Sequence, residues 1–132
     1  LMENQFKLQI ISPEKIIFSD NVKMVTIPSY EGDMSILKDH ISIVTFLRPG
    51  KISIQKSNDS LEEFFVQDGT IEFFKSSLSI LSTSTINVKD LSKEFLDDLN
   101  QNIQKELAKS DISDHDRYVL NHKLDTLKTI SI

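Results

Sequence analysis

The segment IPSYEGDMSILKDH, residues 27–40, decides how the rest of the chain is interpreted. Apolar runs flank it on both sides, so a polar, acidic corner lies between two predicted strands. Gly32 can adopt a positive φ without steric cost, and Glu31 and Asp33 beside it are expected to point their carboxylates outward. Such a corner suits a docking surface. The alternative is that both carboxylates are ordinary solvated loop residues.

Composition limits the class of protein. The chain has 132 residues, 39% hydrophobic and 27% charged, which is typical of one globular domain or of a small domain with an appendage. The net charge is −5, and residues 1–88 carry 8 basic against 11 acidic side chains, while residues 89–132 carry 7 against 9. Because both parts are acidic, no nucleic-acid partner is expected.

Cysteine is absent, so disulfides and thiolate metal sites cannot stabilise the fold, and a reducing compartment is the natural expectation. No apolar run approaches the roughly 20 residues that span a bilayer, and the N-terminus lacks the layout of a signal peptide. We therefore expect a chain that is soluble by itself.

The first two-thirds of the chain have the pattern of short strands separated by turns. Apolar and polar residues alternate in several segments, and Asn58-Asp59 and Asp68-Gly69 are typical turn residues between them. The pattern predicts an antiparallel sandwich or barrel. The expected strands are residues 6–11, 22–27, 41–47, 51–55, 64–66, 71–74, 78–81 and 83–88.

The hydrophobic period changes at Asp90, the expected N-cap of a helix. Ser113 is the expected N-cap of a second helix, and each arm is predicted to span roughly 20 residues. The short connection allows an antiparallel hairpin or one long bent helix. The apolar stripes of the two helices are Leu91, Phe95, Leu99, Ile103 and Leu107, then Leu120, Leu124, Leu127 and Ile130.

The apolar stripes either pack permanently in the core of the protein or form the contact face of a helix pair that can move. A helix pair of this size is marginally stable alone, so we expect it to lean on the sandwich or on a partner protein. An element with two possible partners can act as a conformational switch.

No motif in the sequence indicates catalysis. The chain has three glycines, whose spacing excludes a phosphate-binding loop and a dinucleotide fingerprint. His40, His115 and His122 do not form a metal-binding doublet, and no serine stands in a nucleophile-elbow context. We expect no catalytic, cofactor or metal site, and therefore no enzyme. His40 is explained most simply as an edge residue hydrogen-bonded to backbone.

Several short motifs follow one another along the chain in a fixed order. They are Ser12-Pro13-Glu14-x-x-x-Phe18, Val22-x-x-Val25, Glu31-Gly32-x-x-x-Ile36 followed by His40, Pro49-Gly50, and Gly69 with Glu72. Each motif alone is common, and the specificity comes from the order and intervals of the set. The set resembles the epsilon subunit of bacterial F-type ATP synthase, and the resemblance covers roughly residues 5–130.

The resemblance implies a mainly β fold with α: an N-terminal antiparallel β-sandwich of about ten short strands, followed by a C-terminal antiparallel two-helix hairpin. It implies a rotor-docking domain at residues 1–88 and a regulatory domain at residues 89–132. The sandwich would join the gamma subunit of the central stalk to the ring of c subunits. Glu31 and Asp33 are the expected c-ring contacts, and His40 is the expected gamma contact.

In the family the helix pair folds against the sandwich or extends toward the catalytic head, where it inhibits ATP hydrolysis. The resemblance therefore implies that Arg117, Lys123 and Lys128 meet an acidic loop of the beta subunit in the inhibited state. The alternative is that these basic residues form a solvated face. The subunit is expected at the cytoplasmic side of the bacterial plasma membrane, held there only through the complex.

The sequence also departs from the family pattern. Ser35 replaces a second glycine, and Lys38 and Asp39 replace a frequent Pro-Gly pair, so the backbone path of this corner is expected to differ. Some family members bind ATP through an Ile/Leu-Asp-x-x-Arg-Ala signature that opens the first helix. Residues 91–96 read LSKEFL, without the aspartate or the arginine, so we expect no strong ATP binding.

Two classes of function remain open. The first is a non-catalytic rotor subunit of the proton-translocating ATP synthase with an inhibitory tail. The second is a stand-alone β-sandwich module that binds a ligand or a peptide. No aromatic-lined pocket is expected from the sequence, which favours the first class.

Overall fold

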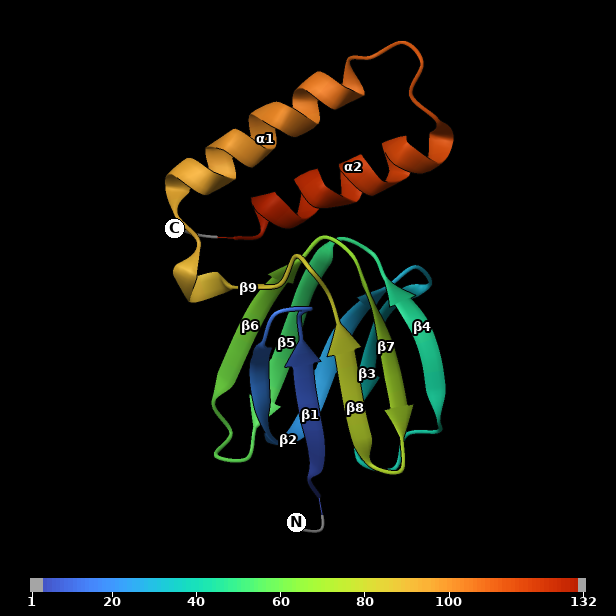
Figure 1. Cartoon of the computed structure of the whole chain (residues 1–132), viewed down its shortest axis with the longest axis vertical. Coiled ribbons are helices and arrows are strands. Elements are labelled where there is room, and N and C mark those ends of the chain that lie inside the picture. Colours follow the sequence, from blue (N-terminus) through green and yellow to red (C-terminus); the bar gives the residue numbers. More distant parts are fainter. Residues whose placement is uncertain (1–3, 131–132) are drawn as a thin grey trace.

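The computed structural model describes residues 4–130, which form a β-sandwich with a pair of helices across one end (Figure 1). A 3₁₀ turn, Val88–Asp90, leads into helices α1 (Lys93–Leu107) and α2 (Asp114–Lys128). The strands are β1 (Phe6–Ile11), β2 (Ile16–Ser29), β3 (Gly32–Ile36), β4 (Ile43–Leu47), β5 (Gly50–Lys56), β6 (Leu61–Val66), β7 (Gly69–Phe74), β8 (Ser77–Leu81) and β9 (Ile86–Asn87). The predicted fold class is confirmed.

Strand β2 connects the two layers of the sandwich. Its first half pairs with β1, and its second half pairs with β3 and β5. One layer therefore runs through β4, β7, β8 and β1, and the other through β3, β2, β5, β6 and β9. All pairings in the described residues are antiparallel except that of β1 with β8, which is parallel. The antiparallel prediction is thus correct for the sheet as a whole and wrong at this one pair.

The core lies between the two layers. Strands β1 and β5 alternate buried and more exposed residues, as their sequence pattern predicts. Phe6 packs edge-on against Phe73, with ring centroids 5.6 Å apart. The buried cluster consists of Phe6, Leu8, Ile10, Val22, Val25, Ile27, Ile36, Leu47, Ile52, Ile54, Phe64, Val66, Ile71, Phe73, Leu78 and Ile80.

The polar corner of residues 27–40 contains a strand that the prediction omitted. β3 pairs with the end of β2, in register from Val25 with Ile36 to Ser29 with Gly32. Alternation of Met34 and Ile36 with polar residues is the signal for this strand. The corner is therefore a β-hairpin, and its tight turn consists of the two residues between Ser29 and Gly32.

The strand predicted at residues 83–88 is wrong for most of its length. Only β9 is extended and paired there, and residues 88–90 form the 3₁₀ turn. The hydroxyl of Ser84 accepts a hydrogen bond from the backbone N–H of Gln67 (3.0 Å) and donates one to the Asp68 carboxylate (3.2 Å). Serine side chains compete in this way with ladder formation, which explains the irregular backbone.

The helix pair is an antiparallel hairpin, and each helix has 15 residues rather than the predicted 20 (Figure 1). Asp90 is not the N-cap of the first helix. Ser92 is the cap, and its hydroxyl accepts a hydrogen bond from the backbone N–H of Phe95 (3.0 Å). Ser113 caps α2 as predicted, accepting from the N–H of Asp116 (3.0 Å). On the α1 stripe Ile103 is buried, whereas Phe95 is 36% exposed.

Candidate partner-binding surfaces

The turn between β2 and β3 presents the predicted acidic corner. Gly32 has φ +121°, which confirms the predicted positive φ, and the Ser29 hydroxyl donates a hydrogen bond to its carbonyl (2.6 Å). Glu31 lies exposed at the tip, and Asp33 is also exposed. The Asp33 carboxylate accepts a hydrogen bond from the Arg48 guanidinium (3.0 Å). Glu31 therefore extends from the tip of a β-hairpin, while Asp33 shares its charge with a neighbouring cation.

His40 lies at the far end of the corner and is half-buried. Its Nδ1 is 2.7 Å from the carbonyl oxygen of Ile41, and its ring packs edge-on to Phe73 with centroids 6.0 Å apart. This is the geometry of an edge residue bonded to backbone. A partner contact by His40 stays a prediction.

The three basic residues predicted to contact the beta subunit do not form one cluster. Arg117 and Lys128 are exposed and lie eleven residues apart on α2, roughly three turns, so they share a face. Lys123 is half-buried and lines a cleft between the two helices, together with Glu106 and Asp116. The side chains therefore point in different directions.

A large apolar surface was missed by the sequence interpretation. We call it the outer sheet face: Val44 and Phe46 on β4, Phe74 on β7 and Leu81 on β8, which are 71%, 64%, 54% and 51% exposed. The strand register aligns Phe46 with Thr70 and Thr70 with Leu81. The sequence feature that could have predicted this face is the β4 segment, because its residues are apolar on both sides of the strand. Clustered exposed apolar residues mark an interaction site.

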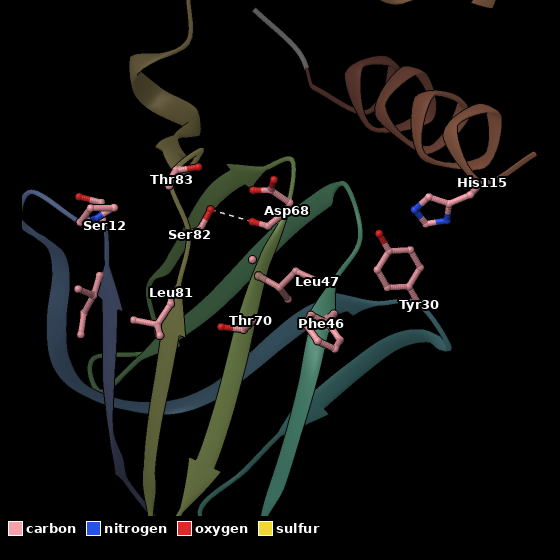
Figure 2. Close-up of a pocket in the computed structure, with 13 residues that line it drawn as sticks. Ser12, Tyr30, Phe46, Leu47, Asp68, Thr70, Leu81, Ser82, Thr83 and His115 are labelled. Atoms are coloured by element: carbon pink, nitrogen blue, oxygen red, sulfur yellow. Dashed lines mark hydrogen bonds between the residues drawn. The ribbon is translucent and has the colours of Figure 1, made fainter. Parts of the chain in front are cut away.

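At the end of the sandwich near α2, the outer sheet face continues into an open groove of about 910 Å³ (Figure 2). Its apolar walls include Pro13, Phe46 and Leu81, and its rim includes Tyr30 and His115. The groove therefore has aromatic side chains that the sequence interpretation did not expect. Ser82 donates a hydrogen bond to the Asp68 carbonyl (2.7 Å) at its edge.

The turn also contacts the second helix. Tyr30 stacks on Tyr118 with centroids 5.9 Å apart and planes 21° apart, and on His115 at 6.4 Å and 26°. Tyr118 packs against His122 at 4.3 Å. We call these four side chains the aromatic cluster. The spacing of His115, Tyr118 and His122 in the sequence places these three rings on one face of a helix. Tyr30 is remote in sequence, so its contact with them could not be predicted from that spacing.

Two members of the aromatic cluster have shifted pKa values. Burial raises the pKa of Tyr30, and the neighbouring Tyr118 and Asp68 add to the shift. Burial lowers the pKa of His122, the Arg48 guanidinium lowers it further, and Asp125 opposes the shift. Both directions favour the neutral form, as expected for rings packed between two elements.

Within residues 4–130, no group of three His, Asp or Glu side chains could hold a metal ion. Neither helix in this part of the chain combines the length and apolar character that a membrane span requires.

Comparison with known proteins identifies relatives of this chain. Residues 5–88 match the family model of the ATP synthase delta/epsilon chain β-sandwich domain. An ATP synthase epsilon chain of Pelagibacter ubique is 41% identical, covering 98% of this chain and 100% of that relative. An ATP synthase epsilon chain of Parvibaculum lavamentivorans is 33% identical, covering 98% of this chain and 97% of that relative.

Solved structures share the fold. A chain in the Euglena gracilis mitochondrial ATP synthase, in a structure of OSCP, F1 and the c-ring, superposes with a TM-score of 0.75 at 17% identity, covering 94% of this chain and 78% of that one. A chain in the central stalk and c-ring structure of the Tetrahymena thermophila mitochondrial ATP synthase superposes with a TM-score of 0.58 at 13% identity. The match covers 94% of this chain and 92% of that one.

Proposed function

This chain belongs to the ATP synthase delta/epsilon family, and from that membership we propose that it is a non-catalytic central-stalk subunit that joins gamma to the ring of c subunits. The observation that carries the proposal is the match over nearly the whole chain to epsilon chains. The subunit would lie at the cytoplasmic side of the bacterial plasma membrane, held there by the rest of the complex.

The outer sheet face is the surface that we assign to gamma. Val44 and Phe46 both lie on β4 and expose large apolar areas, which a stable partner would bury. His40, at the start of the same layer, would lie beside this contact. The second candidate function, a stand-alone module for a ligand or peptide, draws support from the adjoining groove.

Co-purification with gamma tests the assignment. Val44→Asp places a carboxylate in an apolar interface and is expected to weaken binding by about 1–3 kcal/mol, or roughly 5- to 150-fold in Kd. Leu61→Asp is the matched control, because Leu61 is 69% exposed on β6, in the other layer. Equal gamma binding by wild type and Val44→Asp would refute the assigned face. No gamma binding by wild type, with specific peptide binding instead, would favour the second function.

The β2–β3 turn is the surface that we assign to the c ring. Glu31 at the tip is the main contact, since Asp33 would have to share its charge with Arg48. Glu31→Gln is expected to loosen the attachment of the central stalk to purified c rings, more so at low salt. Asp39→Asn, an exposed charge outside the turn, is the control. An effect of equal size in both variants would contradict the assignment.

The helix pair is proposed to inhibit ATP hydrolysis when it leaves the sandwich and reaches the beta subunit. Removing residues 89–132 in the assembled complex is expected to relieve the inhibition. Because Arg117 and Lys128 share a face, the double variant Arg117→Ala/Lys128→Ala should relieve more of it than Lys123→Ala does. ATPase rates unchanged by the truncation would refute the inhibitory role.

A further inference from the structure

We propose that the aromatic cluster is a latch that holds the helix pair against the sandwich and that protonation of His122 opens it. The proposal deepens the proposed function, since release of the helices matters only if they act elsewhere. Its physical basis is independent of gamma and the c ring. It rests on the contacts of α2 with the β2–β3 turn and with the corner at Arg48.

The latch joins elements that are far apart in sequence. Tyr30 comes from the turn, and Tyr118 and His115 come from α2, with Tyr30 stacked on both (Figure 2 shows Tyr30 facing His115). Tyr30 is 40% exposed and Tyr118 is 38% exposed, so the stack is open to water on one side. A contact of this size is strong enough to bias a docked state and weak enough to release it.

His122 connects the latch to the charged groups under α2. Its ring packs against Tyr118, and it lines a cavity of about 440 Å³ between α2 and the sandwich. The charged side chains lining the same cavity are Arg48, Lys51, Asp33 and Glu63 from the sandwich and Asp125 from α2. Asp33 pairs with Arg48 and Glu63 pairs with Lys51, so the sandwich carboxylates are already engaged by cations.

A proton on His122 would therefore be placed beside the Arg48 cation, in a partly buried site. In the docked state its pKa is lowered by burial first and by Arg48 second. Release of α2 would return the pKa to its ordinary value of about 6.5. The docked state then binds fewer protons than the released state, so docking is most favourable above about pH 6.5 and weakens as the pH falls from there toward the lowered pKa.

The chain provides its own reporter for this equilibrium. It contains two tyrosines and no tryptophan, and both tyrosines belong to the latch. Near-UV circular dichroism of the full chain therefore reports on the Tyr30–Tyr118 stack. Far-UV circular dichroism, recorded on the same samples, reports on the fold.

We expect wild type to lose the tyrosine ellipticity as the pH falls below about 6.5, with the far-UV signal retained. His122→Gln, which stays neutral, should keep the ellipticity, while the control His40→Gln should titrate like wild type. Tyr118→Phe, which keeps the ring of the stack, should preserve docking, and Tyr118→Ala, which removes the ring, should weaken docking by about 2- to 12-fold. Docking in the tyrosine variants is measured by hydrogen exchange of the α2 backbone.

A pH-independent wild-type signal, or a His122→Gln variant that titrates like wild type, would overturn the proposal. If His122→Gln does not fold, Arg48→Gln tests the same coupling, because loss of the cation should shrink the pH response. A response of unchanged size would overturn it equally. These measurements use the isolated chain, so failure of the latch and failure of gamma binding are separate results.

Discussion

Two glycines allow the cost of an added methyl group to be separated from the cost of backbone conformation. Gly69 and Gly32 have φ values of +152° and +121°, which residues with a side chain rarely adopt. A Cβ at Gly69 would lie 2.7 Å from the Leu81 carbonyl oxygen and 3.1 Å from a methyl group of Leu47. A Cβ at Gly32 would meet nothing within 4 Å.

Gly32→Ala is therefore expected to cost only backbone strain, about 1–3 kcal/mol. Gly69→Ala carries the same strain plus displacement of the β8 backbone, which adds about 1–3 kcal/mol as overpacking does. For a chain of this size each kcal/mol lowers Tm by roughly 3–5 °C. Urea unfolding followed by far-UV circular dichroism measures both variants. Equal destabilisation by the two substitutions would refute the reasoning from the Cβ contacts.

Other measurements test the remaining features. Spectrophotometric titration should give Tyr30 a pKa above its ordinary value of about 10, and Tyr118→Phe should lower it while burial persists, because Tyr118 is the second cause of the shift. Ile103→Ala should destabilise the helix pair by about 2–5 kcal/mol, seen as faster hydrogen exchange across both helices. Ser113→Ala removes the cap of α2 and should cost about 0.5–2 kcal/mol in the same assay. Calorimetry should detect no micromolar ATP binding, since residues 91–96 lack the aspartate and arginine of the family signature.

The sandwich and the helix pair could be predicted because each depends on local patterns. Period-two burial in β1 and period-four spacing in α1 are properties of short segments. The parallel pairing of β1 with β8 could not be predicted in the same way, because it joins residues about 70 positions apart. The strand predicted at residues 83–88 is wrong for a different reason, because a serine hydroxyl there bonds to the backbone in place of a neighbouring strand.

The candidate surfaces also differ in whether one short segment determines them or several distant segments must meet. Exposure of Glu31 and Asp33 follows from a glycine turn between apolar runs, so the sequence was sufficient. The groove requires the end of β8, the β1–β2 connection and the start of α2 to meet in space. The aromatic cluster likewise requires Tyr30 to meet α2, and no short segment contains both.

The position of β1 between β2 and β8 sets the order in which the sandwich can close. β1 can form a hairpin with β2 as soon as both have left the ribosome, but its second edge stays open until Leu81 has been synthesised. During that interval Leu8 and Ile10, both buried in the finished core, lack the neighbouring strand. Pairings between such distant segments form slowly, so the nascent chain carries an unpaired strand edge, a site for aggregation, until more than half of it has been made.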